Sequence, residues 1–591
     1  MKFCELIADQ LAVLGYTHFF FVGGGNIMHL TGALSKRLRP IPVIHEAAAV
    51  IASEYFNESS GGARSLALVT AGPGLTNAVT GISGSYLESR AALIIGGQVK
   101  TADLATVGIR QRGIQEIDGV AICRPITKLS KRLESTISRQ KISEIFNLPF
   151  QGRKGPVFLE IPLNVQAMDS STENQALFCQ PSEAIPRHSQ AEFNEIVFKF
   201  NKSARPVLLI GGGVQRSTAN NISEQSLKLN LPLATTWNGA DRVDHDHPCY
   251  IGRPNTWGQR SSNIIIQQSD LVISLGTRLG LQQTGFNWQS FVPTGQVIMV
   301  DIDEFELGKG HPELNMAVRA DANSLITELL NHFHPVNKSW LEFCMATRQL
   351  VPLNEVENNF KPEKGFVAPI DFVSWLSRYV DESSIIIPCS SGSAFTCMMQ
   401  AFLQKSSQTI ITNKGLASMG YGLSGAIGAA IANPHKQTFL VEGDGGFSQN
   451  LQELGTVAAN KLNLKIFIFD DSGHASIRMT QKSYFNGQYV GCDRETGLGL
   501  PNWSNIGQPW SIPTVTVSDL GDFSNKECKL LLSKKGPAIF VIRIHPEQTY
   551  YPKIASQVTP DGGMISAALH DMSPKLDRKL AKKVFKFIPS P

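Results

Sequence analysis

The sequence predicts an α/β protein with three doubly wound parallel-sheet domains and a C-terminal tail. Two observations favour this fold class. Short runs of β-branched and aromatic residues alternate with helical stretches along the chain, which is the pattern of parallel strands connected by helices. The chain of 591 residues is also too long for one hydrophobic core, and its 42% apolar and 18% charged residues are ordinary for a large globular protein.

Two polar stretches divide the chain. We therefore expect domains over residues 1–167, 190–335 and 367–548, and a tail over residues 549–591. The first domain opens with an amphipathic helix over residues 1–14. The expected strands cover residues 18–22, 42–45, 65–70, 92–95, 157–161, 206–210, 270–275, 297–302, 385–387, 409–411, 438–441, 465–469 and 538–544.

Composition and charge argue against several classes of protein. No apolar run approaches the ~20 residues of a membrane helix, and the N-terminal segment does not resemble a secretory signal. The nine scattered cysteines lack a CxxC pair, so we expect buried thiols in a reducing cytoplasm. The net charge is +4, but residues 575–587 alone contain six Lys or Arg and one Asp. The rest of the chain is near neutrality, which argues against nucleic-acid binding.

The basic tail has three possible interpretations. It is either a solvated terminal helix, a cover for an anionic substrate, or a weak membrane contact.

The third domain contains two acidic turns that follow neighbouring strands. Residues 438–441 run into Glu442-Gly443-Asp444-Gly445-Gly446, and residues 465–469 run into Asp470-Asp471-Ser472-Gly473. In a right-handed βαβ unit these strand ends lie side by side at the carboxyl edge of the sheet, where open α/β sheets bind ligands. Carboxylates and carbonyls suit Mg²⁺, and the glycines allow backbone N–H groups to approach a diphosphate. The candidate residues are Gly443, Asp444, Gly445, Gly446, Asp471 and Gly473, with Asp444, Asp471 and Gly473 as metal ligands.

This pair of turns resembles the thiamine-diphosphate motif, in which Gly-Asp-Gly is followed about 25 residues later by a pair usually read as Asn-Asn. Here Asp471 lies 27 positions after Asp444, and the pair reads Asp470-Asp471. Aspartate still supplies an oxygen ligand, but its extra negative charge is expected to tighten the dependence on Mg²⁺. The resemblance also places Gly392 and Ser393 against the diphosphate.

The same resemblance assigns a wedge between the two rings of the cofactor. Residues 417–422, which contain Met419, look like the segment that holds thiamine diphosphate bent. The alternative for Met419 is a buried core side chain.

The first domain supplies a candidate catalytic carboxylate. Glu46 follows a strand-like run and opens a helical stretch, a place where Glu is also common as a helix-dipole partner. In the thiamine-diphosphate family that the sequence resembles, a Glu in this setting faces N1′ of the cofactor's aminopyrimidine ring. Proton exchange at this nitrogen activates the thiazolium carbon. Residues 71–77 resemble the family's GPG-x-x-N loop, which implies that Gly74 and Asn77 lie at the pyrimidine end. Gln115 resembles an acetolactate-synthase residue that faces the 2-oxo acid, although a surface amide is the alternative.

The middle domain resembles the FAD-holding domain of acetolactate synthase and pyruvate oxidase. Gly211-Gly212-Gly213 follows a strand but is not the dinucleotide fingerprint G-x-G-x-x-G. Arg278 begins Arg-Leu-Gly-Leu, where those enzymes usually read Arg-Phe-Asp-Asp-Arg. We expect FAD, contacted by Gly212, Gly213 and Arg278, in a structural rather than a redox role.

Residues 1–550 as a whole resemble the acetolactate synthase family, and residues 23–30 and 476–481 are closest to its sugar-modifying, YerE-type branch. The resemblance implies a carboligase that decarboxylates pyruvate or a related 2-oxo acid and adds the two-carbon unit to a ketone. The acceptor is a second 2-oxo acid or a nucleotide-linked keto sugar. The alternatives are a pyruvate oxidase, a simple decarboxylase or a non-catalytic partner subunit. Relatives build each site from two subunits, so we expect a cytoplasmic homodimer or homotetramer.

Overall fold

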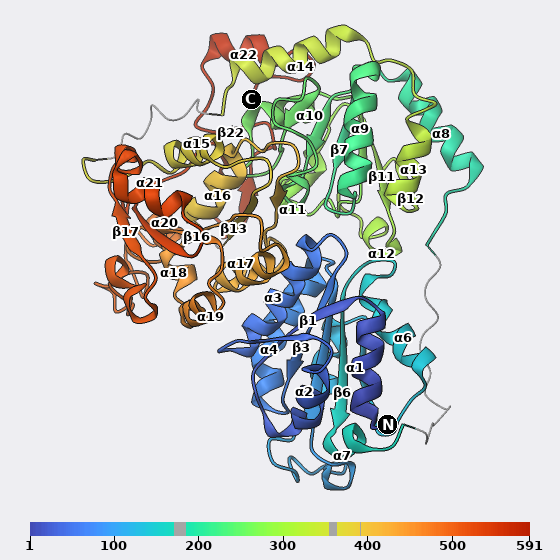
Figure 1. Ribbon diagram of the computed structural model, residues 1–591. Coiled ribbons are helices and arrows are strands. Elements are labelled where there is room, and N and C mark those ends of the chain that lie inside the picture. The colour runs from blue at the N-terminus through green and yellow to red at the C-terminus, as the bar shows by residue number, and fades with distance from the viewer. Residues whose placement is uncertain (171–184, 354–362, 390–391) are drawn as a thin grey trace. The chain divides into compact units, whose positions relative to one another are not determined.

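The computed structural model describes residues 1–170, 185–353, 363–389 and 392–591 (Figure 1). It contains three six-stranded parallel sheets, which confirms the predicted fold class. The chain forms two compact units. The first unit comprises Met1–Ala184, Ser384–Ala394 and Ile411–Pro546, and the second comprises Ile185–Ser383, Phe395–Ile410 and Glu547–Pro591.

The first sheet has the strand order β2-β1-β3-β4-β6-β5. All seven residues of β4 are buried, as expected for a central parallel strand that is covered on both faces. Its strands are β1 (Tyr16–Phe21), β2 (Arg39–Pro42), β3 (Arg64–Val69), β4 (Ala92–Gln98), β5 (Leu129–Arg132) and β6 (Pro156–Pro162). Its main helices are α1 (Phe3–Val13), α2 (Met28–Leu34), α3 (Glu46–Ser59), α4 (Pro73–Leu87), α5 (Gly119–Cys123), α6 (Arg139–Asn147) and α7 (Leu163–Ala167).

The second sheet has the order β12-β11-β10-β7-β8-β9, and helices lie on either side of β7 in Figure 1. Its strands are β7 (Pro206–Ile210), β8 (Leu233–Thr235), β9 (Tyr250–Gly252), β10 (Leu271–Leu275), β11 (Gln296–Asp301) and β12 (Met316–Arg319). Its main helices are α8 (Gln190–Lys202), α9 (Arg216–Leu229), α10 (Arg260–Gln267), α13 (Ala322–Leu329) and α14 (Lys338–Leu350).

The third sheet has the order β14-β13-β15-β16-β18-β17. Its strands are β13 (Ile385–Cys389), β14 (Thr409–Ile410), β15 (Thr438–Gly443), β16 (Leu464–Asp470), β17 (Thr514–Val517) and β18 (Ala538–Arg543). Its main helices are α15 (Pro369–Tyr379), α16 (Gly392–Ala401), α17 (Tyr421–Ala432), α18 (Asp444–Phe447), α19 (Leu454–Ala459), α20 (Ala475–Tyr484) and α21 (Lys526–Ser533).

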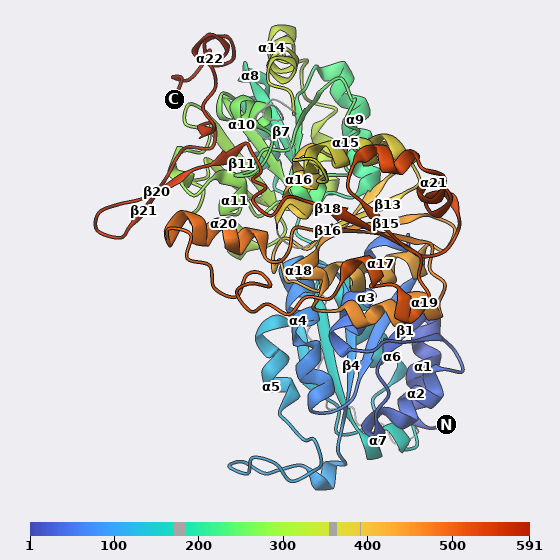
Figure 2. The same cartoon turned by 90° about the vertical axis from the view of Figure 1, so that its left-hand side faces the viewer.

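Helices α3 and α17 join the first and third sheets within the first unit, and they lie side by side in Figure 2. Two glycines of α17 permit this packing. A Cβ on Gly428 would lie 2.0 Å from the backbone oxygen of Ala52, and a Cβ on Gly425 would lie 2.7 Å from the ring of Tyr55. The backbones of the two helices are therefore closer than larger residues would allow.

One predicted strand is misplaced. Residues 42–45 were expected as a strand, but β2 ends at Pro42. Val43 N–H still donates to the Phe21 oxygen, whereas the N–H groups of Ile44 and His45 donate to the side chain of Glu453. The Glu453 carboxylate, from the third domain, therefore replaces the strand partner of these N–H groups, and the chain continues into α3.

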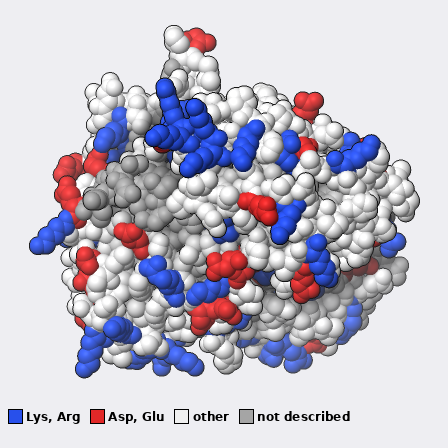
Figure 3. All heavy atoms as spheres, turned by 90° about the horizontal axis from the view of Figure 1, so that it is seen from above, with Lys and Arg blue, Asp and Glu red and all other residues white. Residues whose placement is uncertain are grey.

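The C-terminal tail belongs to the second unit. It forms β19 (Lys553–Ile554), β20 (Ser556–Val558), β21 (Met564–Ser566), β22 (Met572–Ser573) and α22 (Arg578–Val584). Leu569 and Val584 are fully buried, while Lys579, Lys582 and Lys583 are exposed. Lys and Arg gather on the face drawn in Figure 3, which views the molecule from the side where α22 and α14 lie in Figure 1.

The described residues also bear on the expected lack of membrane helices and on the expected state of the cysteines. No helix there is long and apolar enough to cross a membrane. The eight described cysteines are buried and form no disulfide, and Cys179 lies outside the described residues.

Candidate active site

The two acidic turns of the third sheet lie next to each other, as the strand pattern predicts. Strands β15 and β16 are parallel neighbours, and Gly443 is paired with Phe469. Asp444 is fully buried and Asp471 is 4% exposed. Asp444 Oδ2 and Asp471 Oδ1 are buried and accept no hydrogen bond in the described structure. Arg478 Nη2 lies 3.6 Å from Asp471 Oδ1. Buried carboxylate oxygens without hydrogen bonds are costly, so their environment suits a bound divalent cation.

The electrostatics of the turns favour the same ligand. Burial raises the pKa of Asp444, and the neighbouring Asp471 and Asp470 raise it further. Burial likewise raises the pKa of Asp471, while Arg478 opposes this shift. A cation would stabilise the ionised forms of both groups. Within the described residues no cluster of three His, Cys, Asp or Glu side chains could hold a metal, so a cation here would need backbone oxygens as well.

Glycines shape the space around these carboxylates. A Cβ on Gly445 would lie 2.3 Å from Nδ1 of His474. Gly473 has a φ of +139°, and a Cβ there would lie 2.1 Å from the Cys492 oxygen. The structure thus brings Gly443, Asp444, Gly445, Gly446, Asp471 and Gly473 together.

Two further segments with predicted site residues adjoin these turns. Ser393 is 3% exposed, and its Oγ has no hydrogen-bond partner in the described structure. Gly392 precedes it with a φ of +75°, and a Cβ there would lie 3.8 Å from Oγ of Ser476 at the start of α20. Gly420 N–H donates to the Gly446 oxygen, which places the Met419 segment beside the Gly-Asp-Gly turn. Met419 itself is only partly buried, so it is not a core side chain.

Glu46 is the first residue of α3 and is 7% exposed. Asn77 Nδ2 donates to its Oε2 at 3.0 Å. A Cβ on Gly74 would lie 3.6 Å from its Oε1, which makes no hydrogen bond within the described residues. The structure therefore brings Glu46, Gly74 and Asn77 together and leaves one carboxylate oxygen available to a ligand.

Glu453 is a residue that sequence reasoning missed. It is fully buried, and its Oε1 accepts from the N–H groups of Ile44 and His45 at 3.0 Å each. Its Oε2 accepts from Thr456 Oγ1 at 2.7 Å. Glu453 therefore fixes the turn that presents Glu46. No hydrogen bond joins Glu46 to Asp444 among the described residues, and this backbone contact is one link between their surroundings, beside the packing of α3 on α17.

Gln115 is exposed and has a φ of +60°. Its backbone packs on the turn before Gly74, because a Cβ on Gly72 would lie 2.4 Å from the Gln115 oxygen. The loop is held by Glu116, a second residue that was missed. Its carboxylate accepts from the N–H groups of Ala105, Arg112 and Gly113.

Gly212, Gly213 and Arg278 form a separate group in the second unit. They follow β7 and β10, which are neighbours. Gly213 N–H donates to the Gly276 oxygen at 2.9 Å, and Arg242 Nη2 donates to the Gly212 oxygen at 3.3 Å. Arg278 is half-buried. The glycine loop is thus fixed by its own protein contacts, and flavin binding stays a prediction.

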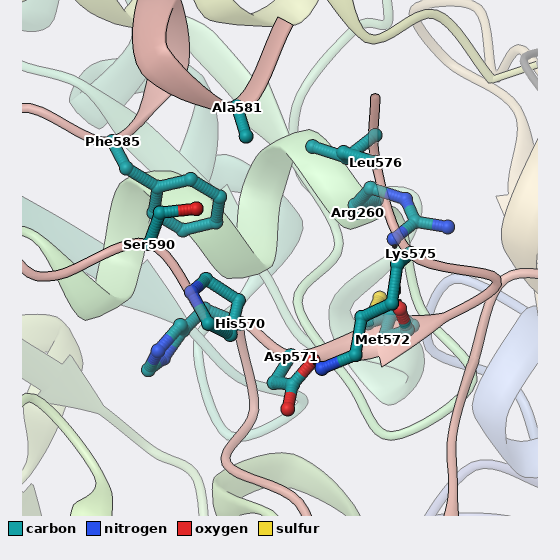
Figure 4. A pocket seen from close by; sticks show the side chains of 10 residues that line it. Arg260, His570, Asp571, Met572, Lys575, Leu576, Ala581, Phe585 and Ser590 are labelled. Atoms are coloured by element: carbon teal, nitrogen blue, oxygen red, sulfur yellow. Dashed lines mark hydrogen bonds and ion pairs between the residues drawn. The ribbon is translucent and has the colours of Figure 1, made fainter. Parts of the chain in front are cut away.

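A small pocket lies between α10 and the tail (Figure 4). Its charged residues have protein partners. Arg260 Nη1 donates to the Met572 oxygen, and Lys575 forms an ion pair with Asp571. None of its lining residues is a predicted site residue. They are Arg260, His570, Asp571, Met572, Lys575, Leu576, Ala581, Phe585, Ser590 and Pro591.

The three domains match three family models in order along the chain. Residues 1–122 match the N-terminal TPP binding domain of thiamine pyrophosphate enzymes, and residues 193–329 match the central domain. Residues 390–542 match the C-terminal TPP binding domain. The chain belongs to the thiamine pyrophosphate enzymes.

Within this family, the chain is related to the acetolactate synthase large subunits. It is 28% identical over 556 residues to acetolactate synthase isozyme 1 large subunit of Escherichia coli, covering 93% of this chain and 95% of that protein. It is 27% identical over 572 residues to acetolactate synthase of Arthrospira platensis, with 93% and 95% covered. It is 28% identical over 612 residues to a probable acetolactate synthase large subunit of Methanocaldococcus jannaschii, with 99% and 98% covered.

Proposed function

We propose that this thiamine pyrophosphate enzyme is a carboligase of the acetolactate synthase type. It would decarboxylate pyruvate or a related 2-oxo acid and add the two-carbon unit to a ketone. The observation that carries this proposal is the setting of Glu46. One of its oxygens is held by Asn77 and the other is unpaired within the described residues, as an acid–base group facing a ring nitrogen requires. A non-catalytic partner subunit would not need such a carboxylate.

We assign roles to the other residues from their positions and from the resemblance to the family. Asp444, Asp471 and the carbonyl of Gly473 would hold Mg²⁺, while Ser393 and the glycine turns would bind the diphosphate. Met419 would keep the cofactor bent, and Gln115 would orient the 2-oxo acid. Bound thiamine diphosphate supplies the carbon nucleophile and stabilises the negative charge left by decarboxylation. Glu46 would hold and move the proton at N1′.

The acceptor is the finer part of the proposal. The names of the relatives support a second 2-oxo acid, as in acetolactate synthesis. Resemblance to the sugar-modifying branch over residues 23–30 and 476–481 supports a nucleotide-linked keto sugar instead. Residues 476–481 lie in α20, which follows the acidic turn at residues 470–473, and Ile477 in this helix is 48% exposed. Side chains at this position could contact an acceptor.

The proposal also covers a second cofactor, the oligomeric state and the cellular compartment. We propose FAD as a structural cofactor of the middle domain and a homodimer or homotetramer with sites between subunits. The described cysteines are buried and form no disulfide, which supports a reducing cytoplasm.

A product screen tests the carboligase proposal. The purified protein, supplied with Mg²⁺ and thiamine diphosphate, is incubated with pyruvate and with 2-oxo acids, small ketones or nucleotide-linked keto sugars. Mass spectrometry should detect an acceptor enlarged by one acetaldehyde equivalent, and visible absorbance reports any FAD. Free acetaldehyde without a ligation product would indicate a decarboxylase. Acetate or acetyl phosphate with flavin reduction would indicate an oxidase.

A further inference from the structure

Arg478 is a buried cation beside the two acidic turns. It lies on α20, and its side chain is 5% exposed. Its Nη2 donates to the backbone oxygen of Asp471 at 2.6 Å and lies 3.6 Å from Asp471 Oδ1. A single guanidinium group therefore contacts both the main chain and the side chain of a candidate metal ligand.

The other nitrogens of Arg478 reach two further segments. Nη1 lies 3.8 Å from Oδ2 of Asp493, and Nε donates to the Pro546 oxygen at 3.2 Å. The segment with Asp493 also contacts the acidic turn at residues 470–473, because the N–H group of the next residue, His474, donates to the Cys492 oxygen at 2.8 Å. Gly473 and Asp493 form an isolated bridge. Arg478 thus connects the acidic turn at residues 470–473 to the segment that contains Asp493 and to the chain after β18.

The charges around the turns make Arg478 and Asp471 interdependent. Asp444 and Asp471 are almost completely buried, and Asp470 is half-buried beside them. Carboxylates this close repel one another, and a buried guanidinium without an acidic partner is also costly. Removing Arg478 alone leaves the carboxylates of the turns without this cation, and removing the Asp471 charge alone leaves Arg478 with Asp493 as its ion-pair partner. Removing both charges takes away the two members of one ion pair together.

We propose that Arg478 is a positioning residue, which holds the Asp471 carboxylate in place for the cation and balances its charge. This inference rests on the proposed Mg²⁺ and thiamine diphosphate site. It predicts a specific coupling between two residues, which a purely structural arginine would not show.

A double-mutant cycle tests the coupling. Equilibrium dialysis measures thiamine diphosphate retained by the full-length protein as Mg²⁺ is varied. Arg478→Gln should weaken retention by about tenfold or more, because a hydrogen bond to a charged group is among the stronger ones. Asp471→Asn should also weaken it, since Arg478 then keeps only the ion pair with Asp493, at 3.8 Å, on the other side of its guanidinium group. The double variant should recover to within about threefold of the wild type, because a balanced pair is removed together.

The control is Lys482→Gln, which removes a positive charge from the exposed face of the same helix and should not change retention. Thermal unfolding of the cofactor-free variants separates folding defects from binding defects. The proposal would be overturned if Arg478→Gln retained thiamine diphosphate at the same Mg²⁺ concentration as the wild type. It would also be overturned if the double variant retained no more thiamine diphosphate than Arg478→Gln. A wild-type protein that retains no thiamine diphosphate would instead overturn the proposed function.

Discussion

At the scale of single residues, the buried carboxylates are the strongest indication of a ligand. Asp444 and Asp471 each have an oxygen that accepts no hydrogen bond in the described structure. An isolated buried carboxylate would normally become neutral or gain a partner. The two groups lie at adjacent strand ends, and Arg478 approaches the Asp471 oxygen at 3.6 Å. The proposed Mg²⁺ would balance their remaining negative charge.

Asp444→Ala should therefore abolish Mg²⁺-dependent retention of thiamine diphosphate, because one metal ligand is lost. The measurement is equilibrium dialysis with and without Mg²⁺. Asp103→Ala, which removes an exposed carboxylate from the first unit, should behave like the wild type. Unchanged retention by Asp444→Ala would show that the metal is placed wrongly.

The sequence predicts that Asp444 and Asp471 lie together, but it does not predict the residues that hold the candidate site in place. Asp444 and Asp471 could be paired because parallel strand ends share an edge of the sheet. Glu453 could not be connected with Glu46, since its contacts with Ile44 and His45 join segments about four hundred residues apart. Such contacts depend on how two domains pack, which no local pattern encodes.

At the scale of elements, the long strands of the three sheets were predicted well and most of the short ones were missed. The prediction for residues 206–210 matches β7, whose five residues are all buried and apolar apart from its proline. Strands β5, β8, β9, β12 and β17 were missed, and each has only three or four residues. Strands β5 and β12 are edge strands that contain Lys or Arg, and β5 has no fully buried residue. Short, polar edge strands lack the apolar run that identifies a central strand.

The packing of α3 on α17 makes a prediction about helix glycines. Gly428→Ala should destabilise the protein by about 1–3 kcal/mol, because the new Cβ would overlap the Ala52 backbone oxygen. Gly32 in α2 is the matched control, since a Cβ there meets nothing within 4 Å. Gly32→Ala should stabilise by about 0.5–1 kcal/mol through helix propensity. Thermal unfolding compares the two, and equal effects would contradict the close packing.

At the scale of the whole molecule, the tail is an integral part of the second unit. Gln268 is fully buried and connects α10 to the C-terminal residues. Its Nε2 donates to the Val584 oxygen, and its Oε1 accepts from the N–H groups of Lys586 and Phe587. The basic composition of the tail did not reveal this anchoring, because the partner is a single neutral side chain more than three hundred residues away.

Gln268→Leu should release the tail, because it leaves three backbone groups without their partner. Limited trypsin digestion should then cleave the Lys-rich tail faster than in the wild type. Gln190→Leu, at an exposed position at the start of α8, serves as the control. Equal digestion rates for the wild type and Gln268→Leu would show that other contacts hold the tail.

The most direct measurement is pyruvate consumption by Glu46→Gln, with bound thiamine diphosphate measured in the same preparation. Glutamine can still accept from Asn77, so the fold and the bound cofactor should be retained. Turnover should fall by about 100-fold or more, because the acid–base group at N1′ is lost. Pyruvate consumption at the wild-type rate would contradict the central role of Glu46.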